Sequence, residues 1–104
     1  MTYKTLPAIE NRIQMIKQEL LALGEMRPGS LSQQSHDPDK RRTYWQLSYT
    51  YKMRSRTEYI RDQFLKDTKT QVKNYKRFKI LIDEWVALSI ERARLKISLE
   101  SSGK

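Results

Sequence analysis

The chain of 104 residues has no cysteine and a single histidine. Without cysteine it has no disulfide framework and no thiolate metal site. The histidine, His36, lies in a polar loop with Asp37 and Asp39, and three ligands so close together on a loop make a weak cation site. Nucleophilic catalysis needs a base held in place, which this histidine does not supply. We therefore expect no metal, no cofactor and no enzymatic activity.

Glycine is scarce and long apolar runs are absent. The three glycines are scattered, so the chain has no glycine-rich loop of the kind that cradles phosphates. No run of about 18 apolar residues, the length of a transmembrane helix, occurs. The N-terminus also lacks the apolar core of a signal peptide. We expect a soluble, cytoplasmic protein that makes no membrane contact.

Positive charge, in contrast, is abundant and unevenly placed. The net charge is +9, and residues 40–79 hold 13 Lys and Arg against three acidic residues. The remaining residues hold eight basic and nine acidic groups, so the whole excess lies in this one segment. Charge concentrated in this way attracts polyanions, nucleic acid first. A surface that merely keeps the protein soluble is the alternative that composition leaves open.

Two helices are predicted, over residues 6–24 and 63–100. The first begins with Thr5 as its cap and an early Pro7, and ends at Gly24. The second has the 3.5-residue apolar repeat of a helix that packs lengthwise against another. A break near residues 67–68 is an alternative for its first turns.

The long helix carries two apolar stripes, whereas the first helix can cover only one. We therefore expect a partner chain and a homodimer. The predicted dimer interface consists of Phe78, Leu81, Trp85, Leu88, Arg92 and Leu95. The second stripe consists of Ile82, Val86, Ile90, Ala93 and Ile97. Within the interface, Arg92 either reaches solvent past the partner helix or pairs with an acid across the dimer, such as Asp83, Glu84 or Glu91.

Three strands are predicted between the helices, over residues 30–34, 43–51 and 54–61. A three-residue loop between the last two would pair Trp45 with Tyr59 and Leu47 with Thr57. A two-residue turn at Lys52-Met53 would pair Leu47 with Glu58 instead. Only the first register separates an apolar face from a polar one, so it is the one we predict.

In that register the outer face of the hairpin carries Gln46 with Arg54 and Arg56. A two-stranded ribbon of this kind enters a major groove or follows a phosphate backbone, while helix lysines contact phosphates. Trp45, Tyr49 and Tyr59 fall on the core face, which favours packing over base stacking. An ordinary solvated sheet face is the alternative. The predicted nucleic-acid contacts are Lys40, Arg41, Arg42, Gln46, Lys52, Arg54, Arg56, Lys66, Lys69 and Lys73.

Two segments, MRPGSLSQQ at residues 26–34 and YWQLSYTY at residues 44–51, carry a resemblance. With them, the chain resembles a small bacterial family of unknown function that has an RPGSLS-Q motif, a QLSYT strand and a long helix. Its members are often encoded beside transposases, which implies a mobile-element or phage setting. The family's loop between the first two strands carries three cysteines spaced like zinc ligands. This chain has none there, so no zinc site is carried over.

Together these features predict a single α+β domain over residues 1–104: an N-terminal helix, a three-stranded antiparallel sheet with a β-hairpin, and a long C-terminal helix that mediates dimerisation. The function expected is a small basic DNA- or RNA-binding accessory or regulatory protein of a mobile element or phage. The alternative is a protein-interaction module or inhibitor that binds a nucleic-acid-processing enzyme and has no nucleic-acid binding of its own. Arg54 and Arg56 discriminate between the two.

Overall fold

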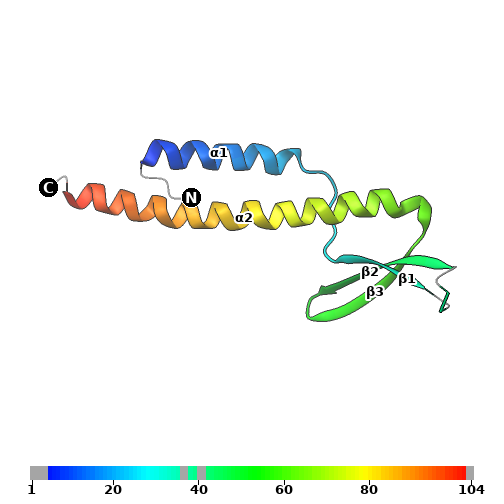
Figure 1. Cartoon of the computed structure of the whole chain (residues 1–104). Coiled ribbons are helices and arrows are strands. Elements are labelled where there is room, and N and C mark those ends of the chain that lie inside the picture. Colours follow the sequence, from blue (N-terminus) through cyan, green and yellow to red (C-terminus); the bar gives the residue numbers. More distant parts are fainter. Residues whose placement is uncertain (1–4, 36–37, 40–41, 103–104) are drawn as a thin grey trace. The chain divides into compact units, whose positions relative to one another are not determined.

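The computed structural model describes residues 5–35, 38–39 and 42–102. Along the chain, three strands follow the first helix and precede the second, in the order α-β-β-β-α (Figure 1). This order confirms the predicted α+β fold. The elements are α1 (Leu6–Ala22), β1 (Ser30–Ser35), β2 (Thr43–Tyr51), β3 (Arg54–Ile60) and α2 (Asp62–Ser102).

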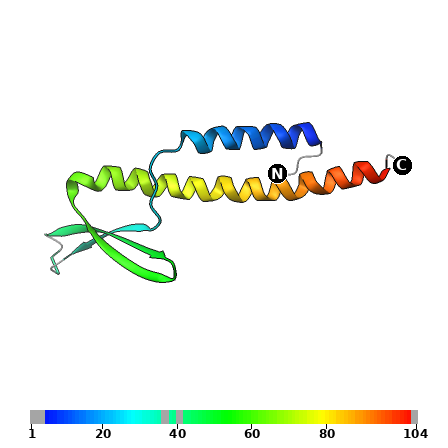
Figure 2. The ribbon, with the colours of Figure 1, turned by 180° about the vertical axis from the view of Figure 1, so that it is seen from behind.

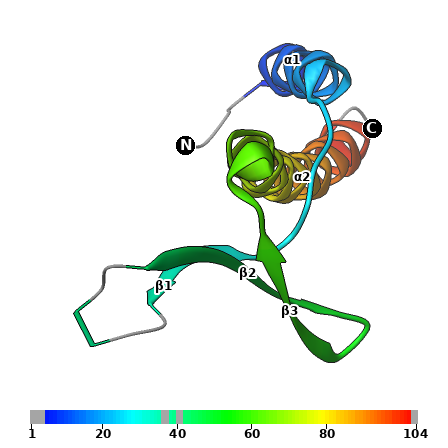
Figure 3. The ribbon, with the colours of Figure 1, turned by 90° about the vertical axis from the view of Figure 1, so that its right-hand side faces the viewer.

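The elements form two compact units, and α2 contributes to both. The two-helix unit contains α1 and the part of α2 from Phe78 onward. The sheet unit, residues 24–77, contains the three strands and the first turns of α2. Figure 2 shows α1 running beside the C-terminal part of α2, and Figure 3 shows β2 between β1 and β3.

In the two-helix unit, α1 begins as the sequence predicts. The Thr5 hydroxyl accepts a hydrogen bond from the backbone N–H of Ala8, at 3.4 Å, and a proline lies in the first turn. Its apolar stripe packs on α2 and forms an aliphatic core, which explains the three-four spacing of both segments. The buried core residues are Ile9, Ile13, Ile16, Leu81 and Leu88.

The helix α2 is continuous from its first turn, so the alternative break near residues 67–68 does not occur. The hydroxyl of Thr68 donates to the backbone oxygen of Phe64 at 2.8 Å, one turn earlier. This bond satisfies a side chain that is only 4% exposed. A polar threonine is thereby accommodated inside the helix where it meets the sheet unit's core.

The sheet is antiparallel in the order β1-β2-β3, but the predicted hairpin register is wrong. The strands are joined by the two-residue turn Lys52-Met53, and Leu47 pairs with Glu58. Both turn residues have positive φ, 51° and 65°, which is typical of tight hairpin turns.

The register prediction failed because it treated the whole hairpin as half-buried. The sheet unit's core is small and consists of Leu47, Ile60 and Val72, with Trp45 and Tyr49 among the apolar residues packed against it. It buries Ile60, at 7% exposure, and leaves its neighbour in the chain, Tyr59, at 63%. The rest of β3 is exposed. Polar side chains on that part of the core face therefore stay hydrated and carry no desolvation penalty.

Candidate nucleic-acid interface

The corrected register changes which side chains share a face of the hairpin. In an antiparallel pair, residues directly opposite each other point to the same side. Arg56 is opposite Tyr49 and Arg54 is opposite Tyr51. Both arginines therefore lie on the face of Leu47, not with Gln46 as predicted.

On the opposite face of the sheet, none of the residues that the three strands contribute is charged. It presents hydroxyls, amides and two tyrosine rings, whose centroids are 6.0 Å apart. Such a face contributes no electrostatic attraction to a polyanion. Its members are Ser30, Ser32, Gln34, Tyr44, Gln46, Ser48, Thr50, Ser55, Thr57 and Tyr59. The predicted base-reading ribbon, in which arginines stand beside Gln46, is thus not formed.

The lysines of α2 do lie together. Lys69, Lys73 and Lys76 line one groove of about 350 Å³, and all three are exposed. Their spacing of four and three residues places them on one side of the helix. The remaining lining residues are Leu31 and Trp45 of the sheet and Val72 of α2.

One lysine of this groove contacts an aromatic ring. The Lys69 ammonium lies 4.8 Å from the centroid of the Trp45 ring, within the range of a cation–π interaction. In the described part of the chain, none of Lys69, Lys73 and Lys76 forms an ion pair. Three positive charges therefore face solvent along one edge of the groove.

The other predicted contacts are dispersed. Lys52 lies in the hairpin turn, with its ammonium 5.4 Å from the Tyr51 ring centroid. Arg42 is exposed just before β2, and Lys66 is exposed on α2 without lining the lysine groove. Gln46 is half-buried on the uncharged face. The predictions for residues 40 and 41 lie outside the described residues.

Arg27 is a functional candidate that the sequence did not single out. Its guanidinium lies 5.6 Å from the centroid of the Tyr49 ring and forms an ion pair with Glu58. Its backbone N–H donates to the backbone oxygen of Gln71 in α2, at 3.1 Å. Arg27 belongs to the RPGSLS segment, whose only signal in the sequence is its resemblance to a family. Residues this far apart along the chain leave no signal in spacing.

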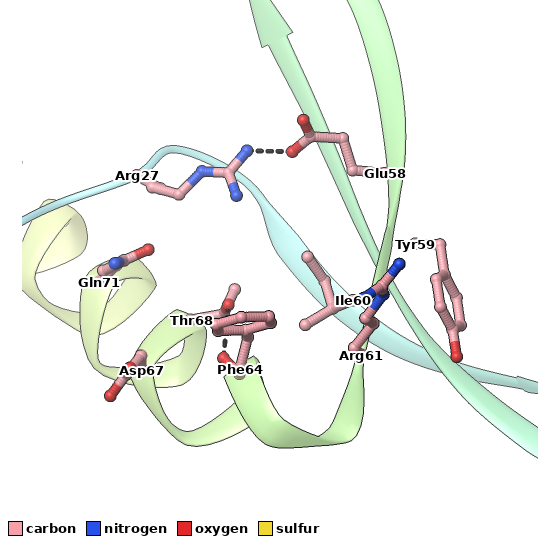
Figure 4. Close-up of a pocket in the computed structure, with 9 residues that line it drawn as sticks. All are labelled: Arg27, Glu58, Tyr59, Ile60, Arg61, Phe64, Asp67, Thr68 and Gln71. Atoms are coloured by element: carbon pink, nitrogen blue, oxygen red, sulfur yellow. Dashed lines mark hydrogen bonds and ion pairs between the residues drawn. The ribbon is translucent and has the colours of Figure 1, made fainter.

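Arg27 and Glu58 also line a second pocket, of about 540 Å³, between β3 and α2 (Figure 4). In this view the Phe64 ring lies between Ile60 and Thr68. The lining mixes two arginines with two carboxylates, so its charges largely compensate one another, unlike those of the lysine groove. The complete lining is Arg27, Glu58, Tyr59, Ile60, Arg61, Phe64, Asp67, Thr68 and Gln71.

The predicted dimer interface is largely occupied by α1 of the same chain. Leu81 and Leu88 are buried at 0% and 4% exposure, and Trp85 and Leu95 pack against the same core. Arg92 pairs with Glu10 of α1, with an N–O distance of 3.1 Å, rather than with an acid across a dimer. Phe78 is half-buried. The first helix thus covers this stripe, and the stripe left exposed contains Val86, Ile90 and Ile97.

The described residues form neither a metal-binding cluster nor a membrane-spanning helix. Among the described residues, no three His, Cys, Asp or Glu side chains are grouped so as to hold a metal ion. The weak candidate at residues 36–39 includes two positions outside the described residues. Neither described helix has the length and apolar character needed to cross a membrane. Comparisons of the chain with protein-family models, with curated proteins and with solved structures found no match.

Proposed function

We propose that this protein binds nucleic acid through the lysine groove of the sheet unit and acts as a homodimer. The observation that carries the proposal is the alignment of Lys69, Lys73 and Lys76 along one groove, without ion pairs to described residues. Lysine is a point-charge phosphate ligand and does not read base edges. The binding proposed is therefore tolerant of sequence.

The span of the three lysines along the helix is comparable with the spacing of phosphates along a nucleic-acid strand. From Lys69 to Lys76 the helix rises roughly 10 Å. Successive phosphates of one B-form strand are about 3.4 Å apart along the duplex axis, so the three lysines span about three phosphates. The Arg54 and Arg56 side chains, on the core face of the hairpin, add charge to the same unit.

The resemblance of the RPGSLS and QLSYT segments supports a biological setting for this activity. We propose an accessory or regulatory role in a mobile element or phage, because members of that family are often encoded beside transposases. In this chain the arginine and the glycine of the RPGSLS segment both contribute to the fold of the sheet unit. Arg27 joins Glu58 and Tyr49, and Gly29 has a φ of 128° that other residues rarely adopt.

The test is a salt titration of binding to short duplex DNA, single-stranded DNA and structured RNA. We expect log K to fall linearly with log[salt], with a slope of several units. The double variant Lys69→Gln, Lys73→Gln should reduce the magnitude of the slope by about 1.8, which corresponds to two phosphate contacts at about 0.9 each. No binding of any of the three ligands at about 50 mM salt, where the screening length is long, would overturn the proposal.

A matched control separates the groove from overall charge. Gln14→Glu with Gln18→Glu alters two exposed positions of α1 and removes the same amount of net charge. We expect this variant to keep the slope of the unmodified protein. Equal losses in both double variants would assign the attraction to net charge rather than to the groove.

An interaction module that captures a nucleic-acid-processing enzyme is the second candidate function. The exposed stripe on α2 favours it, since Val86 and Ile90 are 54% and 51% exposed. Isolated exposed apolar residues are common, but a continuous stripe marks an interaction surface. Under this alternative, Arg54→Glu with Arg56→Glu impairs capture of the enzyme, and there is no free nucleic-acid binding to lose.

A further inference from the structure

The exposed stripe of α2 forms an apolar groove in the two-helix unit. Val86, Ile90 and Ile97 are between 51% and 66% exposed. The groove has a volume of about 420 Å³ and is lined by Ile82, Trp85, Val86, Ser89, Ile90 and Ala93. It lies on a different side of α2 from Leu81 and Leu88, which α1 covers. A helix face of this kind is stabilised when a second apolar helix packs on it.

Charged residues bracket this stripe in a specific order. Lys79, Val86, Ala93 and Glu100 follow one another at steps of seven and so lie on one line along the helix. The line therefore begins with a positive charge and ends with a negative one. Asp83 and Arg94 are eleven residues apart, about three turns, and share one edge of the stripe. On this edge the negative charge comes first.

This order distinguishes the two ways in which a second copy can lie on the stripe. In a parallel pair each charge faces its own copy, so Lys79 meets Lys79 and Asp83 meets Asp83, which is unfavourable. In an antiparallel pair Lys79 faces Glu100 and Asp83 faces Arg94. The midpoints of both pairs fall next to Ser89, a small residue that allows close approach. The apolar Val86 then faces Ala93 about the same midpoint.

We propose that two copies of this chain pair antiparallel through the Val86–Ile90 stripe and cross near Ser89. The proposal rests on the homodimer included in the proposed function and does not depend on nucleic-acid binding. It assigns the dimer to a face of α2 other than the predicted interface, and it specifies the direction of the partner. The partner is a second copy because the charges along the stripe complement their own reversed order.

The first test is the oligomeric state of the full chain by sedimentation equilibrium. We expect a dimer, and we expect Val86→Glu to shift it to monomer, because a charge in an apolar helix interface is left unpaired. Leu99→Glu is the control on the other side of the same helix, where the side chain is 58% exposed. This variant should remain dimeric. A monomeric unmodified protein, or loss of the dimer in Leu99→Glu alone, would overturn the proposal.

The second test determines direction and uses the absence of cysteine from the chain. Ser89→Cys, close to the crossing point, should be linked to itself by a short bismaleimide. Ile82→Cys and Ile97→Cys should not link to themselves, because in the antiparallel pair each lies roughly 20 Å along the helix from its own copy. A mixture of these two variants should link. Linking of all three single variants with equal yield would overturn the antiparallel arrangement.

The two proposals fail separately. If Val86→Glu and the unmodified protein are both monomers while salt-dependent binding to nucleic acid persists, the dimer is overturned and the groove function stands. If the linking pattern is as expected but no nucleic acid binds at about 50 mM salt, the groove function is overturned and the dimer stands.

Discussion

The two units of this molecule use charge in different ways. In the two-helix unit, ion pairs join α1 to α2: Arg12 with Glu84 at 2.6 Å, and Arg92 with Glu10 at 3.1 Å. In the sheet unit, Arg27 pairs with Glu58, but Lys69 lies over Trp45 and forms no ion pair with a described residue. Residues 24–77 hold 13 basic and six acidic residues, whereas the rest of the chain holds eight and six. Charged side chains therefore join the helices of one unit in pairs, whereas the other unit carries an excess of positive charge.

The cores differ as well. The two-helix unit has an aliphatic core of five buried isoleucine and leucine residues, while the sheet unit buries Leu47, Ile60 and Val72 beneath partly exposed aromatic side chains. Each unit has one tryptophan, Trp85 and Trp45 respectively. Trp45→Phe and Trp85→Phe backgrounds therefore report on the two units separately.

The largest effect is expected from Leu81→Ala in the two-helix core. Leu81 is fully buried, so the truncation leaves a cavity and should lower the free energy of unfolding by about 2–5 kcal/mol. In urea unfolding, the midpoint reported by Trp85 should fall more than that reported by Trp45. Leu47→Ala in the sheet unit should show the reverse order. If both tryptophans report the same shift in both variants, the units unfold together and their separation has no energetic meaning.

Gly29→Ala should destabilise the sheet unit by about 1–3 kcal/mol, because φ at this position is 128°. An added Cβ would also lie 2.7 Å from the backbone oxygen of Ser48. Gly24→Ala is the matched control, since its Cβ would meet only the Asn74 side chain at 3.5 Å. Urea unfolding followed by Trp45 measures both. Similar stabilities of the two variants would contradict the strained conformation at Gly29.

The Arg12–Glu84 pair should contribute about 1 kcal/mol in a double-mutant cycle, because two nitrogens of Arg12 bond the two carboxylate oxygens at 2.6 and 2.8 Å. Substitution by Met and Gln, singly and together, with unfolding followed by Trp85, measures the coupling. The Arg92–Glu10 pair is more exposed, at 39% and 50%, and should couple by roughly 0.5 kcal/mol or less. A stronger coupling in the exposed pair would reverse the ranking.

The smallest effect is expected from Met53→Gly in the hairpin turn. Met53 has a φ of 65°, which glycine adopts without strain, so the variant should stabilise the sheet unit by about 0.5–1 kcal/mol. Ser55→Gly, in the extended strand β3, should destabilise it instead. Thermal unfolding followed by Trp45 distinguishes the two signs. Destabilisation by Met53→Gly would show that the methionine side chain contributes to the turn.

Local patterns predicted the elements well, because helix caps and apolar spacing are recorded within a few residues. The Thr5 cap and the 3.5-residue apolar repeat of α2, which places Leu81 and Leu88 in one stripe, are examples. The prediction of the hairpin register was wrong for the opposite reason. It depends on how far the core extends along the sheet, and the sequence does not indicate that the core ends at Leu47 and Ile60.

The same distinction, between local patterns and contacts distant in the chain, applies to the candidate nucleic-acid interface. The order of the elements and the excess of positive charge in one segment could be predicted from the sequence, because each follows from neighbouring residues. Three relations emerge only in the folded chain: Arg54 and Arg56 share a face with Leu47, α1 covers the Leu81–Leu88 stripe, and Arg27 contacts Tyr49 and Glu58. These relations join residues that are distant in the chain. They depend on which of the apolar side chains the two small cores bury.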